Sequence, residues 1–328
     1  MNSQKPSRNL ALELVRVTEA AALSAGRFMG RGQKEVADKA AVDAMRLVLN
    51  SIDMDAVVVI GEGEKDEAPM LFNGEIVGTG KDPKVDLAVD PIDGTRPLAN
   101  GFLNSIATVA IAPRDTMYNP GPFVYMDKIA VGEAAAGAID INAPVRHNLQ
   151  QVAKATGKEV SEVTVIILDR PRNEGYIRDV REAGARISLI GDGDIQAAIA
   201  TAIHGNGIDI MLGIGGSPEA VTTACAMAAL RGEIQCKLWP RDESERQYAH
   251  DHGHDLDQVL TTRDLVDSDN TFFAATGVTT GPLLKGVWFG GIHTTTHSVI
   301  MRSKSGTVRF VQADHRVEWV EGDIKPCL

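Results

Sequence analysis

Cysteines are rare in this sequence, and long apolar runs are missing. Among 328 residues only Cys225, Cys236 and Cys327 are cysteines, and their spacing is not that of zinc ligands. Such a set excludes a disulfide framework and is typical of a reducing compartment, so we expect a cytoplasmic protein. No segment reaches the ~18 apolar residues that a membrane span requires, and charges interrupt the apolar stretch at 10–29. We therefore expect a soluble chain with no membrane partner and no targeting signal.

An excess of positive charge is also missing. The 33 Lys and Arg residues are outnumbered by 44 Asp and Glu residues, which gives a net charge of −11. A negative field repels polyanions, so the composition excludes non-specific binding of nucleic acid. Aromatic residues make up only 5%, but the hydrophobic share of 44% is ordinary for a globular chain of one large or, more typically, two domains. An anionic ligand must then be held by local cations or by metal ions.

The apolar pattern of the first half predicts helices followed by strands. Apolar residues recur at intervals of three and four over 9–27 and again over 42–52, which is typical of amphipathic helices. The loop between them, at 30–34, is rich in glycine and basic residues. The pattern then changes to β-branched and alternating runs, which predict strands at 56–60, 85–90, 105–112 and 124–131. This half is therefore predicted to be α+β.

The second half, from about residue 143, alternates between strands and helices. Strands are predicted at 163–168, 186–190 and 208–212, and helices near 147–156, 173–183, 194–204 and 217–230. Ser217 and Pro218 are typical of a helix start. Repeated strand and helix units predict a mainly parallel sheet covered on both faces. We expect an α/β protein with two domains, at 1–145 and 146–328.

Two acidic segments follow predicted strands in the first half. One is Asp90-Pro91-Ile92-Asp93-Gly94-Thr95, and the other is Gly61-Glu62-Gly63-Glu64 with the charged residues 65–67 behind it. Strands of one sheet can bring both segments to the same edge, where gathered carboxylates repel each other unless a cation lies between them. Oxygen ligands favour Mg²⁺ or Mn²⁺. Each segment by itself is also compatible with an ordinary charged turn, above all at residues 65–67, but the two together favour a metal site.

The acidic motifs resemble those of the lithium-sensitive, metal-dependent sugar and inositol phosphatases. The likeness is greatest to class II fructose-1,6-bisphosphatase of bacteria, and it covers nearly the whole chain. Besides DPIDGT at 90–95, the similar segments are RVTE (16–19), GRG (30–32), AD (37–38), IGEGE (60–64), DEAPML (66–71), YM (125–126), RPR (170–172), DGD (192–194) and GIGGSPE (213–219).

The resemblance implies a layered α/β/α/β/α fold and the hydrolysis of the 1-phosphate of fructose 1,6-bisphosphate in gluconeogenesis. It implies that Mg²⁺ or Mn²⁺ is bound by Asp38, Glu62, Asp90, Asp93 and Glu219. It also implies that Thr95, with Glu62, orients the attacking water. Residues expected to contact the sugar phosphate are Asp93, Gly94, Thr95, Tyr125, Arg170, Pro171, Arg172, Asp192, Gly193, Asp194 and Gly216. The first domain would carry the carboxylate clusters, and the second would carry Glu219 and most sugar-phosphate contacts. A homodimer or homotetramer is expected.

Other functions remain open at this point. The same chemistry could act on sedoheptulose 1,7-bisphosphate, inositol monophosphate or a nucleotide 3′-phosphate, because the motifs for the hydrolysed phosphate do not separate these substrates. A glycine-rich segment at 213–216 after a predicted strand also suggests a dinucleotide-binding oxidoreductase, although Pro218 and Glu219 break the required spacing. A silent regulator is a further reading, because Lys39 lies next to the proposed ligand Asp38 where glycine is usual in the family.

Overall fold

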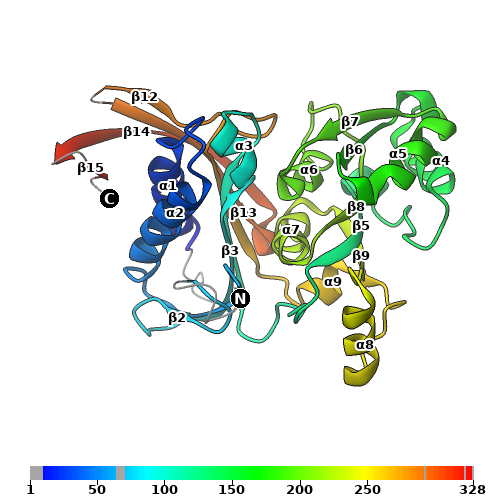
Figure 1. Cartoon of the computed structure of the whole chain (residues 1–328), viewed down its shortest axis with the longest axis horizontal. Coiled ribbons are helices and arrows are strands. Elements are labelled where there is room, and N and C mark those ends of the chain that lie inside the picture. Colours follow the sequence, from blue (N-terminus) through cyan, green and yellow to red (C-terminus); the bar gives the residue numbers. More distant parts are fainter. Residues whose placement is uncertain (1–9, 64–70, 292, 321–322, 327–328) are drawn as a thin grey trace, which may run out of the picture.

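The computed structural model describes residues 10–63, 71–291, 293–320 and 323–326. Two β-sheets and three helical layers form an α/β/α/β/α arrangement (Figure 1). From one side to the other the layers are α1 with α2, the first sheet, α6 with α7, the second sheet, and α4 with α5. The layered α/β fold that the sequence predicts is therefore confirmed.

The first sheet combines strands from both ends of the chain. Its order is β15-β14-β13-β11-β4-β3-β1-β2, and β12 pairs with β13. Only β1 and β3 run parallel among its described pairs. The strands are β1 (Asp55–Ile60), β2 (Ile76–Val77), β3 (Lys84–Asp93), β4 (Ile106–Pro113), β11 (Phe272–Gly277), β12 (Trp288–Gly290), β13 (His293–Arg302), β14 (Thr307–Val320) and β15 (Asp323–Pro326).

Two antiparallel helices cover the outer face of this sheet. They are α1 (Ala11–Gly26) and α2 (Lys34–Leu49), and both follow the predicted apolar periodicity. Leu14, Val17 and Ala21 of α1 are fully buried against the sheet, together with Met45 and Leu49 of α2. The apolar stripe read from the sequence is thus the face that packs on the first sheet.

The strands predicted in the second half, β6, β7 and β8, run parallel as expected, but antiparallel strands join them, so the second sheet is mixed rather than mainly parallel. Its order is β10-β9-β5-β8-β6-β7, and among the pairs of the described strands only β6 with β7 and β6 with β8 are parallel. A short buried apolar run reads the same in either direction, so the sequence could not show that β5 and β9 are antiparallel. The strands are β5 (Tyr125–Val131), β6 (Thr164–Leu168), β7 (Arg186–Ile190), β8 (Ile210–Gly216), β9 (Glu233–Leu238) and β10 (Leu260–Thr261).

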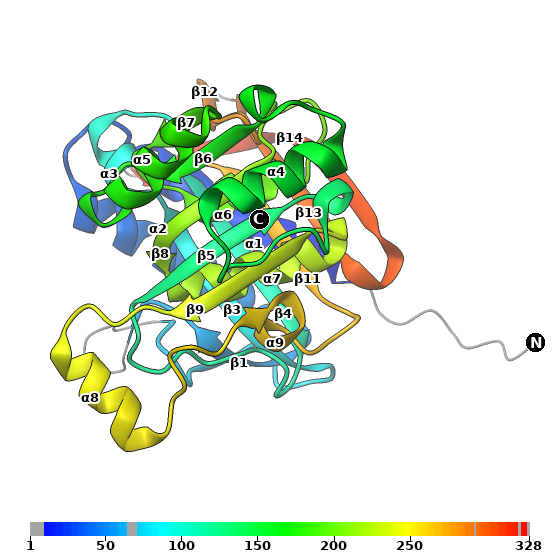
Figure 2. The ribbon, with the colours of Figure 1, turned by 90° about the vertical axis from the view of Figure 1, so that its right-hand side faces the viewer.

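Helices pack on both faces of the second sheet (Figure 2). The helices α4 (Val145–Thr156) and α5 (Glu174–Ala183) cover the outer face, and α6 (Asp194–Ala200) and α7 (Ser217–Leu230) fill the layer between the sheets. Three further helices are α3 (Thr95–Asn100), α8 (Glu243–His252) and α9 (Thr262–Leu265). Short 3₁₀ turns lie at η1 (Glu133–Ala135), η2 (Val160–Glu162), η3 (Pro171–Asn173) and η4 (Ser303–Ser305).

Several boundaries differ from the sequence prediction. The helix predicted to reach residue 204 ends at Ala200, and the strand predicted at 208–212 begins at Ile210 and continues through Gly216. The segment at 213–216 is therefore a strand end rather than a loop. The helix from Ser217 to Leu230 has the predicted limits, with Pro218 in its first turn. No helix of the described residues is both long and apolar enough to cross a membrane.

The two sheets are not divided at residue 145, where the sequence predicts a domain boundary. Strand β5 comes before this boundary but belongs to the second sheet, and β11 to β15 come after it but belong to the first. After the second sheet is complete, β11 returns to pair with β4 along its whole length. The chain thus crosses between the sheets twice, and the space between them is bordered by segments that are far apart in sequence.

Candidate active site

A cavity of about 550 Å³ opens between the two sheets. Its first wall is built by the ends of β1 and β3 with the start of α2, and its second by the ends of β6 and β8 with the starts of α6 and α7. All the predicted site residues except Pro171 line it: Asp38, Glu62, Asp90, Asp93, Gly94, Thr95, Tyr125, Arg170, Arg172, Asp192, Gly193, Asp194, Gly216 and Glu219. Residues that lie far apart in the sequence, from Asp38 to Glu219, therefore meet in one pocket.

The first wall carries four carboxylates. The parallel pairing of β1 with β3 places Glu62, which follows β1, beside the end of β3. The ladder between β3 and β4 shifts register between Asp90 and Asp93, so both aspartates of the DPID segment line the cavity. Asp38 joins them from the first turns of α2. The described parts of both acidic segments therefore reach one edge of the sheet, as the sequence predicts.

Some of these carboxylate oxygens lack hydrogen bonds. Among the described residues, Oδ2 of Asp93 and Oε2 of Glu219 are fully buried without a hydrogen-bond partner. A buried anionic oxygen without a partner costs on the order of several kcal/mol. In the present side-chain positions no three Asp, Glu, His or Cys residues of the described part form a closed ligand set. The wall is thus an electrostatically incomplete surface that a cation would complete.

Burial and mutual repulsion raise the pKa values of these groups. Burial, followed by the charges of Asp38 and Glu219, raises the pKa of Glu62 to about 7. Burial and the Asp194 carboxylate likewise raise the pKa of Glu219 to about 7. The pKa values of Asp90 and Asp93 lie well above their usual range, mainly because of burial and neighbouring carboxylates. Such shifts are expected where carboxylates gather without a countercharge.

A tight turn connects the acidic wall to α3. Gly94 has φ of 95°, a conformation that glycine adopts without strain, and its carbonyl accepts a 2.7 Å hydrogen bond from Ser105 Oγ. Thr95 Oγ1 donates to the carbonyl of Ile92 at 3.2 Å. The turn places Gly94 and Thr95 on the cavity wall next to Asp93.

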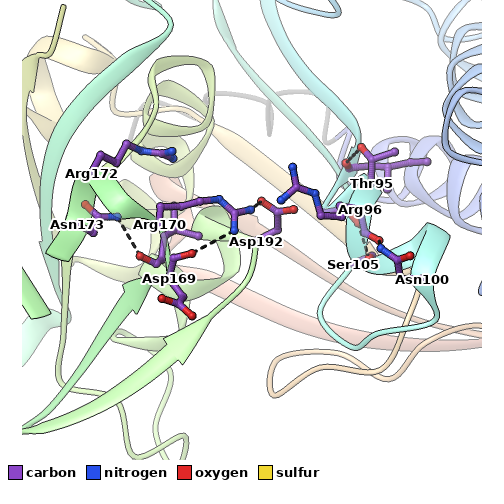
Figure 3. Close-up of polar contacts among 12 residues, drawn as sticks. Thr95, Arg96, Asn100, Ser105, Asp169, Arg170, Arg172, Asn173 and Asp192 are labelled. Carbon is purple, nitrogen blue, oxygen red and sulfur yellow. Dashed lines mark hydrogen bonds and ion pairs between the residues drawn. The ribbon is translucent and has the colours of Figure 1, made fainter. Parts of the chain in front are cut away.

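The second wall carries arginines whose side chains are already fixed (Figure 3). Arg170 Nη2 lies 2.8 Å from Asp192 Oδ1. Arg172 Nε donates to the Ile214 carbonyl at 3.0 Å, and its guanidinium lies 4.3 Å from the ring centroid of Tyr125. In Figure 3 the side chain of Arg96, from the first wall, points toward Asp192. Two cations of the second wall are therefore oriented at the cavity before any ligand is bound.

Asn173 explains how the arginine segment is held. Its side chain donates to the carbonyls of Leu168 and Ile214 and accepts the N–H of Ile214, so it ties the end of β6 to β8. Gly213 lies against it with φ of 126°, and a Cβ there would lie 2.9 Å from the Asn173 amide oxygen. The sequence alone did not assign this role to Asn173. Its structural role needed the packing of β6 against β8.

Not every predicted feature belongs to the cavity. Pro171 is exposed and begins the turn η3, so it shapes the arginine segment but does not line the cavity. Lys39 points to solvent, and its Nζ lies 2.8 Å from Asp43 Oδ2 along α2. Its charge is therefore directed away from Asp38 and does not oppose a metal ion there. Residues 64–67 lie outside the described part of the chain.

The structure adds three basic residues that sequence reasoning missed. Lys34 and Arg96 line the cavity, and Lys128 is buried behind its second wall. Lys34 stands in the basic loop that the sequence showed, and its charge opposes the raised pKa of Asp38 and of Glu62. Lys128 is a single lysine in an apolar strand pattern, and this was the one signal that could have found it.

Comparisons with known proteins agree with this geometry. A family profile described as bacterial fructose-1,6-bisphosphatase, glpX-encoded, matches residues 8–315. The chain belongs to this family. It is 43% identical over 324 residues to fructose-1,6-bisphosphatase 1 class 2 of Escherichia coli K12, covering 95% of this chain and 96% of the relative. The class 2 fructose-1,6-bisphosphatase of Shigella flexneri matches with the same identity and coverage.

Solved structures give a weaker likeness. The extragenic suppressor protein suhB from Bartonella henselae aligns with a TM-score of 0.34 and 15% identity, over 60% of this chain and 74% of that chain. We draw no argument from a likeness of this size. Family membership rests on the sequence match, and it excludes the dinucleotide-binding oxidoreductase, as does the carboxylate Glu219 at the helix start where a pyrophosphate would lie.

Proposed function

We propose that this chain hydrolyses the 1-phosphate of fructose 1,6-bisphosphate to fructose 6-phosphate and phosphate, the reaction of gluconeogenesis. One observation carries the proposal: a single cavity joins a wall of uncompensated carboxylates to a wall of fixed arginines. A sugar with a phosphate at each end matches two such walls, because one phosphate lies beside metal ions and the other beside guanidinium groups. The name of the family supports the choice of substrate.

The donor set fits Mg²⁺ or Mn²⁺ as cofactor. Carboxylate oxygens from Asp38, Glu62, Asp90 and Asp93 of the first wall and from Glu219 at the start of α7 line the cavity, and two of their oxygens are buried without a hydrogen-bond partner among the described residues. Hard oxygen ligands prefer these ions. When bound there, divalent ions would neutralise the phosphoryl oxygens and lower the pKa of a water molecule. This contribution matters because uncatalysed hydrolysis of a phosphate monoester is extremely slow.

Residues of the chain then orient the reacting groups. The Thr95 hydroxyl, with the Glu62 carboxylate, would hold the attacking water in line with the 1-phosphate. The backbone N–H groups of Gly94 and Thr95 would donate to the phosphoryl oxygens as negative charge develops on them. The left-handed φ of Gly94 supports this role, because it lets the backbone lie at the cavity wall without a side chain.

The second wall would hold the sugar and its 6-phosphate. Arg170 and Arg172 can donate to the phosphate, and Tyr125 lies beneath the Arg172 guanidinium. Asp192 and Asp194, next to Gly193, can accept hydrogen bonds from sugar hydroxyls. Gly216 lines the cavity beside Glu219, and a side chain is excluded at this position because a Cβ would clash with the Glu219 carboxylate.

We also propose that the protein acts in the cytoplasm as a homodimer or homotetramer. The long strand β14 extends the first sheet beyond α1 and α2 (Figure 1). Large apolar side chains are exposed on this end of the sheet, with 61% exposure for Trp288, 41% for Phe289 and 50% for Phe310. These residues lie on β12 and β14, which both pair with β13, and exposed aromatic side chains are typical of protein contacts.

A panel of phosphate esters tests the function. Phosphate release is measured with fructose 1,6-bisphosphate, sedoheptulose 1,7-bisphosphate, inositol monophosphate and a nucleotide 3′-phosphate, with Mg²⁺ or Mn²⁺ and with EDTA as control. We expect the highest kcat/KM for the hexose bisphosphate. A higher value for inositol monophosphate, which carries no second phosphate, would contradict the proposed role of the arginine wall.

A further inference from the structure

A lysine lies fully inside the protein behind the second wall of the cavity. Lys128 is in the middle of β5 and is only 2% exposed. Its strand neighbours on the same face, Met126 and Ala130, belong to the apolar core between the two sheets. The Lys128 side chain therefore extends from the second sheet into the layer that holds α6 and α7.

The ammonium group connects the starts of these two helices. Nζ of Lys128 lies 2.5 Å from Oδ2 of Asp194, the first residue of α6, and 2.7 Å from the carbonyl oxygen of Gly216, which precedes α7. Asp194 and Gly216 both line the cavity, whereas Lys128 does not. One buried cation thus links two separate segments of the cavity wall from behind.

The glycines beside Lys128 leave the space that this arrangement needs. A Cβ at Gly215 would clash with the Asp194 carboxylate and lie 2.9 Å from the lysine Nζ. The φ angle of Gly215 is not in the left-handed region, so the reason for glycine here is steric. Within the GIGG segment, which suggested a nucleotide-binding loop, Gly215 is therefore the glycine that the buried ion pair requires.

Stability alone does not account for this ion pair. Removing a lysine and a carboxylate from water costs several kcal/mol each, and a well-packed apolar pair is often as stable or more stable. The Asp194 carboxylate needs a buried partner only if it must stay charged at the cavity wall. Burial lowers the pKa of Lys128, but the Asp194 and Glu219 carboxylates outweigh this effect and keep the lysine charged.

We propose that Lys128 is a positioning residue for substrate binding, which holds the Asp194 carboxylate and the Gly216 segment in place on the cavity wall. The proposal rests on the proposed function, in which Asp194 accepts a hydrogen bond from the sugar. Lys128 touches neither the substrate nor the reacting phosphate. It acts through Asp194, so its loss should weaken substrate binding more than the chemical step.

Kinetics of Lys128→Met test this assignment. We expect KM for fructose 1,6-bisphosphate to rise about tenfold or more, as for the loss of one charge-assisted hydrogen bond, while kcat stays within about threefold. Lys128→Arg keeps the positive charge and can still donate hydrogen bonds to Asp194 and to the Gly216 carbonyl, so its KM should lie between those of the parent and of Lys128→Met. The matched control is Lys158→Met, because Lys158 pairs with Asp209 at the same 2.5 Å in this half of the molecule but lies outside the cavity lining. Its KM should not change.

A double-variant cycle with Asp194→Asn decides whether the pair acts as a unit. We expect Lys128→Met with Asp194→Asn to have a KM within about threefold of Asp194→Asn alone, because the lysine acts only through this carboxylate. The double variant leaves no unpaired buried charge, so it remains informative if Lys128→Met alone does not fold. A KM at least ten times that of Asp194→Asn, or an unchanged KM in folded Lys128→Met, would overturn the proposal. Failure of the proposed function shows differently, because the parent chain would then release no phosphate from the bisphosphate.

Discussion

The two walls of the cavity differ in how the charges of their side chains are balanced. On the second wall Arg170 is paired with Asp192, and Asp194 is paired with the buried Lys128, although Glu219 at the start of α7 keeps one oxygen without a hydrogen-bond partner among the described residues. On the first wall Asp90 and Asp93 face further carboxylates, and their pKa values rise accordingly. A wall whose charges are paired is organised before the ligand arrives, whereas a wall of like charges is complete only with a cation. In the proposed function this difference separates binding, on the second wall, from chemistry, on the first.

Removal of divalent ions should affect the first wall most. Excess EDTA is expected to abolish phosphate release, and Mg²⁺ or Mn²⁺ should restore it, because the carboxylates would otherwise repel the phosphate. Li⁺ should inhibit by competing for a metal position. The measurement is phosphate release against free metal concentration. Full turnover in excess EDTA would show that the acidic wall needs no cation.

Asp90→Asn should weaken the first wall without changing its volume. Losing one anionic ligand is expected to raise the metal concentration for half-activation strongly and to lower kcat by about a thousandfold, since metal stabilisation of the transition state is worth several kcal/mol. Thermal unfolding in EDTA should stay near that of the parent, because the residue is not part of the apolar core. An unchanged metal requirement would remove Asp90 from the ligand set.

Thr95→Ala tests the water-orienting hydroxyl of the same wall. The metal ligands remain, so the metal requirement and KM should be unchanged, while kcat falls by roughly 10² to 10⁴, the range for a positioned proton-transfer group. Thr95→Ser is the matched control and should keep most of the activity. If the alanine variant turns over at the parent rate, the hydroxyl serves only its hydrogen bond to Ile92.

Arg172→Ala tests the paired wall. Its KM for the bisphosphate should rise at least about tenfold, because a hydrogen bond to a charged group is worth about 1.5 to 3 kcal/mol. The metal requirement should be unchanged. Arg178→Ala is a suitable control, since this arginine pairs with Asp179 on the exposed side of α5. A folded Arg172→Ala variant with the parent KM would place the 6-phosphate elsewhere.

The smallest expected effect is on the pH dependence of stability without metal. Because the pKa values of Glu62 and Glu219 are raised to about 7 from 4.5, the folded state binds protons more tightly than the unfolded state. Their stabilising contribution is complete below about pH 4.5 and is lost as the pH rises through about 7. We expect the Tm in EDTA to fall by a few degrees between pH 5.5 and pH 8.

The Glu219→Gln variant is the control for this titration. Glutamine does not ionise, so its Tm in EDTA should fall less over the same pH interval. Added Mn²⁺ should reduce the fall in the parent, since a bound cation favours the ionised carboxylates. An equal fall in Glu219→Gln and the parent would show that other groups cause it.

Sequence by itself determined the helices α1, α2 and α4 to α7, the strands β1 and β3 to β8, and the acidic clusters. Local signals suffice for these: the apolar stripes of α1 and α2, the Ser217-Pro218 start of α7, and the strand ends before Glu62 and at Asp90. Resemblance of the motifs to a known family then supplied the roles of Asp38 and Glu219, whose local patterns are ambiguous. Each of these inferences needs only residues that lie close together in the chain.

Only the tertiary structure decided how distant segments meet. Strands β6, β7 and β8 run parallel as predicted, but the sequence did not show that β5 and β9 join the same sheet antiparallel, because a buried strand has the same pattern in either direction. The return of β11 to β4, the separation of Lys39 from the cavity and the contact of Lys128 with Asp194 depend on contacts between residues far apart in sequence. Such contacts leave no periodic signal, because the partner of a buried charge is set by the packing of whole layers and not by its neighbours in the chain.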